Sequence, residues 1–202
     1  MKTNRNATKR ASSQPSKRIT NIRKNQRIGK YIANKTHEKK ELYVDAEWFI
    51  SQRMYLLGYA YNLRQYGQLY GKALCRENVR NLLRNVDTVY FWGPDIGMLE
   101  KCFRISIRNH VRCINLLKVM HYIEPNAISY KLAHFESLAG IHRKTMEYKS
   151  NIWTLHRDWK DPQKRQRALL YNMEDVLNML RVKRYFWKKH GITREHEDMF
   201  SM

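Results

Sequence analysis

The chain has 202 residues, with 39 Lys and Arg against 18 Asp and Glu, which gives a net charge of +21. This length suffices to bury a core, and the hydrophobic content of 43% excludes a chain that is disordered throughout. Eight Gly and four Pro are too few for a turn-rich β-sandwich or barrel, and three Cys are too few for a disulfide scaffold. The longest apolar run, residues 54–63, is about half of the ~20 residues that span a bilayer, so we expect no transmembrane segment.

The first 40 residues differ in composition from the rest of the chain. They hold thirteen Lys and Arg and one acid, for a net charge of +12, whereas the remaining 162 residues carry +9. They contain no aromatic residue before Tyr31 and few aliphatic side chains, so they cannot bury enough apolar surface to fold alone. We therefore predict a basic extension over residues 1–40, disordered when free and ordered on a partner, and a single helical domain over residues 41–202.

From residue 41 onward, apolar residues recur at three- and four-residue steps, which is typical of amphipathic helices. The pattern predicts helices over residues 44–66, with Asp45 as the N-cap, over residues 68–86, and from Pro94 to a point before Pro125. Two long C-terminal helices are predicted over residues 126–160 and 162–190, the second ended by Gly191. Only residues 88–92 also fit a strand. We therefore predict an all-α fold of four to five helices with an extended basic N-terminal tail.

Catalytic and metal-binding patterns are weak. The phosphate-loop, dinucleotide-binding, zinc-protease and nucleophile-elbow motifs do not occur in the sequence. Four possible metal ligands share one predicted helix, where ligands eight residues apart are separated by about 12 Å and cannot close a tetrahedron: Cys102, His110, Cys113 and His121. The only acid–base candidates are histidines beside acids, a pattern that is usually a solvated surface: His156 with Asp158, and His196 between Glu195 and Glu197. We expect no catalytic residue, no metal, no cofactor and no small-molecule substrate.

Basic residues and tyrosines are the candidates for binding. In the extension, the side chains expected to contact RNA phosphates are Arg5, Lys9, Arg10, Lys17, Arg18, Arg23, Lys24 and Arg27. In the body, they are Lys164, Arg165 and Arg167 at a helix N-terminus, and Arg181, Arg184 and Lys188 on one face of the last helix. Four tyrosines at helical spacing are predicted to stack on bases or to form an interface, with packing between helices as the alternative: Tyr55, Tyr59, Tyr66 and Tyr70.

Three hypotheses of function follow from these patterns. The first is a non-catalytic, RNA-contacting structural subunit of a large ribonucleoprotein, specifically a ribosomal and plausibly mitochondrial ribosomal protein, bound to rRNA or other structured RNA and to neighbouring proteins. The second is an accessory subunit of a respiratory complex, an ATP synthase or a microtubule lattice, whose basic tail binds acidic protein or anionic lipid. The third, an enzyme or nuclease, rests only on the His–acid neighbours. We expect a reducing intracellular compartment, the mitochondrial matrix or the cytoplasm.

Overall fold

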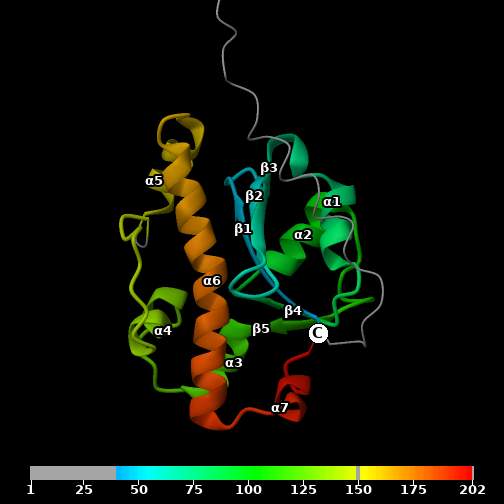
Figure 1. Cartoon of the computed structure of the whole chain (residues 1–202), viewed down its shortest axis with the longest axis vertical. Helices are drawn as coiled ribbons and strands as arrows, with labels where there is room; N and C mark the ends of the chain where they lie inside the picture. The colour runs from blue at the N-terminus through cyan, green and yellow to red at the C-terminus, as the bar shows by residue number, and fades with distance from the viewer. Residues whose placement is uncertain (1–39, 149–150, 202) are drawn as a thin grey trace, which may run out of the picture. The chain divides into compact units, whose positions relative to one another are not determined.

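The computed structural model describes residues 40–148 and 151–201, all of which lie in the second of two units of the chain, residues 39–202. Within these ranges five strands form one mixed sheet, and helices pack on both of its faces (Figure 1). The predicted all-α fold is therefore wrong. The eight basic candidates in the predicted extension lie outside the described residues. No helix in the described ranges combines the length and the apolar character that crossing a membrane requires.

The sheet positions the ends of its parallel strands at one edge. Its strands are β1 (Glu41–Trp48), β2 (Met54–Ala60), β3 (Tyr66–Tyr70), β4 (Thr88–Phe91) and β5 (Arg112–Asn115). They lie in the order β3-β2-β1-β4-β5, with β1, β2 and β3 antiparallel and with β1, β4 and β5 parallel. The strand order reverses between β1 and β4. In open α/β sheets, ligands bind at such a reversal, at the carboxyl ends of the strands.

The helices differ from the predicted ones in number and position. They are η2 (Gly71–Ala73), α1 (Arg76–Leu83), α2 (Asp95–Phe103), α3 (Leu116–Ile123), α4 (Leu132–Leu138), α5 (Ile152–Lys160), α6 (Arg165–His190) and α7 (Arg194–Asp198). The helix predicted over residues 126–160 is wrong, because this range holds two short helices, α4 and α5. Helix α6 lies within the range predicted for the last helix. It ends at Gly191, whose φ of 62° is in the left-handed region that glycine favours.

The first strand shows why a helical period fails here. Alternate residues of a strand face opposite sides of the sheet. Leu42, Val44 and Ala46 pack in the core beneath α1 and α2, whereas Tyr43 packs on the α6 side. Strand β4 is buried along its whole length, as is typical of a parallel strand between two helical layers. A short run buried on both faces has no alternation, so its period does not separate strand from helix.

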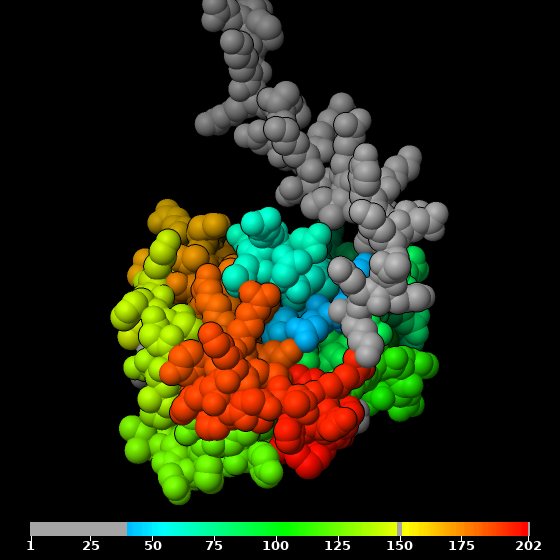
Figure 2. All heavy atoms as spheres, turned by 60° about the horizontal axis from the view of Figure 1, so that its bottom comes forward, coloured from blue at the N-terminus to red at the C-terminus, as the bar shows by residue number. Residues whose placement is uncertain are grey.

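Helix α6 crosses the sheet in close contact with β1 and β2. Gly58 of β2 lies beneath it, and a side chain at this position would overlap Asn172 and Val176. Since Gly58 pairs with Asp45 across the β1–β2 ladder, this glycine allows α6 to approach the middle of β1. Figure 2 shows the C-terminal part of α6 and α7 side by side at the surface. They are joined by Trp187, which donates a 2.7 Å hydrogen bond from Nε1 to the buried Glu197.

Candidate active site

Three carboxylates from β1 and α6 converge on the α6 side of the sheet. Asp45 and Glu47 are two residues apart on β1, so both side chains leave the strand on the same face, and Asp175 approaches them from α6. One carboxylate oxygen of each residue lies within 4.8 Å of the others. Glu47 and Asp175 are buried, and Asp45 is partly buried. We call these three residues the acidic cluster.

A fourth carboxylate, Asp95, adjoins the acidic cluster. It is the first residue of α2, just after β4, and the ends of the parallel neighbours β4 and β1 meet at the same edge of the sheet. Its Oδ1 accepts a hydrogen bond from the N–H of Ala46 (3.4 Å), the residue between Asp45 and Glu47. Its Oδ2 is buried and has no hydrogen-bond partner in the described part of the chain.

Burial and mutual repulsion perturb all four carboxyl groups. Burial, followed by the charge of Asp175 and of neighbouring acids, raises the pKa of Asp45 and of Glu47 well above the ordinary values. Burial also raises the pKa of Asp95 to about 8, against the opposing effect of backbone hydrogen bonds. It raises the pKa of Asp175 to about 6, although Arg143 opposes the shift. Buried, crowded carboxylates are unfavourable unless a cation compensates them, and such perturbed groups cluster at functional sites.

A line of side-chain amides orients Asp45. Nδ2 of Asn172 on α6 donates to Oδ2 of Asp45 (2.7 Å) and to its backbone oxygen (3.2 Å). Gln68 of β3 in turn donates to Oδ1 of Asn172 (2.8 Å). Three elements of the fold therefore hold one carboxylate of the acidic cluster in a single orientation.

Arg143 places a buried positive charge beside the acidic cluster. Its side chain is 2% exposed, and its guanidinium forms ion pairs with Asp175 and with Glu136 of α4. Burial alone would lower the pKa of Arg143, but these two partners raise it, so the group stays charged. The guanidinium carbon lies 5.2 Å from the centre of the Tyr171 ring. Nη1 is buried and meets no acceptor within the described residues, so the N–H groups of this nitrogen have no partner.

Tyr171 adds a neutral donor to the same place. It is four residues before Asp175 on α6, so the two side chains share a helix face, and the Tyr171 hydroxyl lowers the pKa of the Asp175 carboxyl. Burial and the charges of Asp175, Glu47 and Asp45 raise the pKa of Tyr171, so its hydroxyl keeps its proton at neutral pH. The acidic cluster is thus bordered by a guanidinium and a phenol, both of which can donate to an anion.

The His–acid pairs considered in the sequence do not form acid–base pairs. Nε2 of His156 lies 3.1 Å from the backbone oxygen of Trp48, whereas Asp158 accepts a 2.9 Å hydrogen bond from the hydroxyl of Tyr148. His196 caps the start of α7 through its contact with Thr193. The four Cys and His residues considered as metal ligands are not brought together. Cys102 lies on α2, His110 in the loop that follows, Cys113 on β5 and His121 on α3.

The basic candidates of the body form no ion pair with the acidic cluster in the described part of the chain. At the start of α6, Lys164 is exposed, the guanidinium of Arg165 lies over the ring of Trp159 (5.3 Å), and Arg167 pairs with Glu147. Farther along α6, three candidates lie on the exposed surface: Arg181, Arg184 and Lys188. Their contact with RNA phosphates stays a prediction.

The tyrosine candidates do not form a helical stripe. Tyr55 and Tyr59 lie on β2, whereas Tyr66 and Tyr70 lie on β3. Tyr55 is buried against Phe49 (4.4 Å between ring centres) and Trp159 (4.8 Å), while Tyr66 and Tyr70 are exposed. Their role in stacking or at an interface stays a prediction.

None of the four carboxylates is predicted as a site residue from the sequence, and Asp45 is interpreted there as a helix cap. Two signals could have found three of them, Asp45, Glu47 and Asp175. Asp45 and Glu47 alternate with Val44, Ala46 and Trp48, so a strand would place both acids on one face. Tyr171 and Asp175 stand four residues apart in a helix, which places a phenol and a carboxylate together.

Comparison with known proteins gives one match. A sequence model described as the RNase H superfamily matches residues 42–187, a range that contains all four carboxylates, Arg143 and Tyr171. A search of curated proteins and a search of solved structures each returned no match.

Proposed function

Because the chain belongs to the RNase H superfamily, we propose that it is a nuclease that hydrolyses phosphodiester bonds of nucleic acid with a divalent metal ion. The observation that carries the proposal is the acidic cluster, which lies where the parallel strands of the sheet end. Its carboxylates come from separate elements, and their burial in the fold raises their pKa values.

Two predictions from the sequence are corrected by this membership. The chain is not a structural ribosomal subunit, and the expectation that it is not an enzyme is also wrong, because the α/β fold and the superfamily match indicate a nuclease. The expected class of partner, nucleic acid, agrees with the superfamily. The net charge of +21 indicates a polyanionic partner but does not distinguish binding from cleavage.

The donor set fits a hard divalent cation. All of its ligand atoms are carboxylate oxygens, which Mg²⁺ and Mn²⁺ prefer. Asp45, Glu47 and Asp95 form no ion pair with any described residue, and the buried Oδ2 of Asp95 lacks a partner. The site therefore has carboxylate oxygens that can bind a cation. A bound cation would stabilise charge on the phosphate and activate a water for attack.

The surrounding side chains orient the substrate and limit where protons can go. Glu136 holds the Arg143 guanidinium from one side, which leaves Nη1 free to donate to a phosphate oxygen that carries growing charge. The Tyr171 hydroxyl stays protonated and can donate to the same phosphate or to the attacking water. In the reaction, a water oxygen bonds to phosphorus and one P–O ester bond breaks. One fragment keeps the phosphate, and the leaving oxygen of the other takes a proton.

The test is cleavage of labelled single-stranded DNA, single-stranded RNA and an RNA–DNA hybrid by the purified full chain. We expect cleavage of at least one substrate with Mg²⁺ or Mn²⁺ and none with EDTA. Asp45→Asn, Glu47→Gln and Asp175→Asn should each reduce the rate about 10³-fold or more, because cation binding provides several kcal/mol of transition-state stabilisation.

Glu77→Gln is the matched control for Glu47→Gln, since Glu77 is an exposed acid on α1. It should leave the rate unchanged. Cleavage that persists in EDTA, cleavage that survives in the three variants, or no cleavage of any substrate with either metal would contradict the proposed function.

A further inference from the structure

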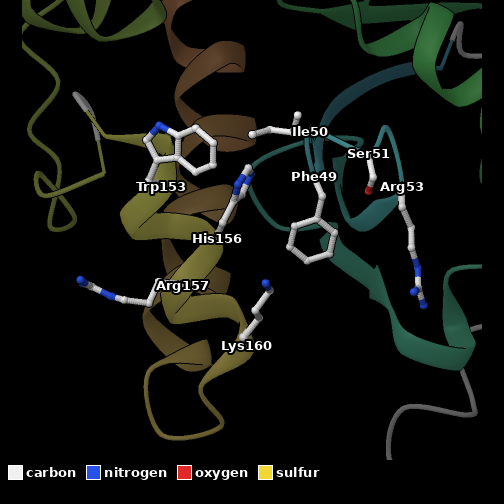
Figure 3. A pocket seen from close by; sticks show the side chains of 8 residues that line it. All are labelled: Phe49, Ile50, Ser51, Arg53, Trp153, His156, Arg157 and Lys160. Carbon is white, nitrogen blue, oxygen red and sulfur yellow. The ribbon is translucent and has the colours of Figure 1, made fainter.

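A groove opens between the β1–β2 turn and α5, just after the end of the strand that carries Asp45 and Glu47. It has a volume of about 610 Å³, and Figure 3 shows Phe49, His156 and Lys160 pointing into it. Phe49 follows Glu47 by two residues, which is about 7 Å along an extended chain. A nucleic-acid strand with one phosphodiester at the acidic cluster would therefore reach this groove with its neighbouring nucleotides.

Aromatic rings form the walls of the groove, and their positions are fixed by packing. His156 is held by its 3.1 Å contact with the backbone oxygen of Trp48, and Phe49 packs on Tyr55 with 4.4 Å between ring centres. Trp153, at the rim, is 63% exposed and meets the ring of His156 only edge-on, at 6.1 Å and 83°. An indole that keeps most of its surface in water offers a stacking platform for a planar group.

Positive charge surrounds these rings, and none of the described residues that line the groove is acidic. Nζ of Lys160 lies 5.6 Å from the centre of the Phe49 ring. The side chain of Arg157 donates to Asp158 yet stays 69% exposed, and Arg53 is exposed on the opposite wall. Aromatic faces interleaved with cations that follow a backbone are the features by which proteins hold single-stranded nucleic acid.

We propose that this groove binds single-stranded nucleic acid, with a base stacked on Trp153 and with backbone phosphates against Lys160, Arg157 and Arg53. The proposal deepens the proposed function by naming its substrate class, and it rests on that function. A duplex is disfavoured because its bases are already stacked and offer no free face to Trp153. The groove thus selects unpaired strands for the acidic cluster.

The test measures binding without cleavage. Fluorescence anisotropy of labelled oligo-dT and oligo-U is recorded in EDTA with the full chain carrying Glu47→Gln, over a series of KCl concentrations. Adding Trp153→Ala should weaken binding about 5- to 100-fold at every salt concentration, because loss of stacking removes a contact that salt does not screen. Adding Lys160→Ala should instead make the negative slope of log K against log salt shallower by about 0.7, as expected for one lost phosphate contact with a single strand.

The matched controls are Tyr122→Ala, which removes another exposed aromatic ring, and Arg80→Ala, which removes an exposed cation on α1. Both should bind as the parent does. Equal binding by Trp153→Ala and Tyr122→Ala would overturn the proposal, and so would an equal loss of affinity for a duplex of the same length. Comparing oligo-dT with oligo-U shows whether DNA or RNA is preferred.

Failure of the groove proposal can be separated from failure of the proposed function. Hydrolysis of the p-nitrophenyl ester of thymidine 5′-monophosphate by the wild-type chain with Mn²⁺ tests the acidic cluster alone, because this small phosphodiester has no second nucleotide to fill the groove. If the ester is hydrolysed but Trp153→Ala binds oligonucleotides as the parent does, the groove proposal is contradicted and the proposed nuclease function is not.

Discussion

The two faces of β1 serve different purposes within eight residues. On one face, Leu42, Val44 and Ala46 are buried against α1 and α2 in an apolar core. On the other face, Asp45 and Glu47 are enclosed beneath α6, where burial raises their pKa values. The first face gains stability from every buried side chain, whereas the second holds groups that oppose one another. A fold retains such a face when the crowded groups have a chemical task.

Arg143→Gln should give the largest loss of stability on the α6 side. It leaves Asp175 and Glu136 buried without their counter-charge, so the free energy of unfolding should fall by about 3–5 kcal/mol at pH 8 in EDTA. The loss should shrink at pH 5.5, where the carboxyl groups can take up protons. Urea denaturation measures both values. Arg167→Gln is the control, because its ion pair with Glu147 is exposed and should contribute little. Similar losses for the two variants would refute a buried pair at Arg143.

Leu42→Ala tests the apolar side of the same strand. Leu42 is 0% exposed, so removing most of its side chain should reduce the free energy of unfolding by about 2–5 kcal/mol. The melting temperature should fall by about 2–4 °C for each kcal/mol. Because Leu42 faces away from the acidic cluster, the loss should be the same at pH 5.5 and 8.5 and with or without Mn²⁺. A loss that depends on pH or metal would show that the two faces are coupled.

The pH dependence of stability also distinguishes the acidic face of β1 from its apolar face. The pKa values of Asp175 (about 6) and Asp95 (about 8) are raised above those of the unfolded chain, so the folded state binds more protons between pH 4 and 8. The free energy of unfolding in EDTA should therefore fall as the pH rises through this window, by at most about 1.4 kcal/mol per pH unit for each proton. Asp95→Asn should flatten the curve between pH 6 and 8. A wild-type curve that rises over the same range would contradict the raised pKa values.

The sequence predicts some of these elements for physical reasons that can be named. The 26-residue α6 has a long amphipathic period and a glycine end signal, and the observed helix lies within the predicted range. The strands are short and lie between helical layers, so β4 and β5 lack the alternation that reveals a strand. The break between α4 and α5 has no proline, but it does have local signals: Gly140, with a φ of 67°, follows the end of α4, and the side chain of Asn151 caps the start of α5. The apolar residues that recur at three- and four-residue steps on both sides of this segment outweigh these signals in the predicted helix.

The site was harder to predict than the fold, because its members are far apart in the chain. Asp45 and Asp175 meet only because α6 packs over the glycine at position 58. Arg143 follows Gly140 in a segment predicted as helix, and its pairing with Asp175 depends on the position of α4. Composition emphasises the 39 basic residues, whereas the chemistry lies in a few of the 18 acids.

The most direct test of the acidic cluster is the melting temperature of the wild type and of Glu47→Gln at pH 8, each measured in EDTA and in Mn²⁺. In EDTA, Glu47→Gln replaces a buried carboxyl group that faces other acids with a neutral amide, so this variant should be the more stable of the two by about 0.5–2 kcal/mol. In Mn²⁺, the wild type should gain stability because the ion binds only the folded cluster, and the variant should gain much less. The difference in stability between the two proteins should therefore narrow, or change sign, when metal is added. A variant that is less stable than the wild type in EDTA, or that gains as much from Mn²⁺, would contradict a cation site built from Asp45, Glu47 and Asp175.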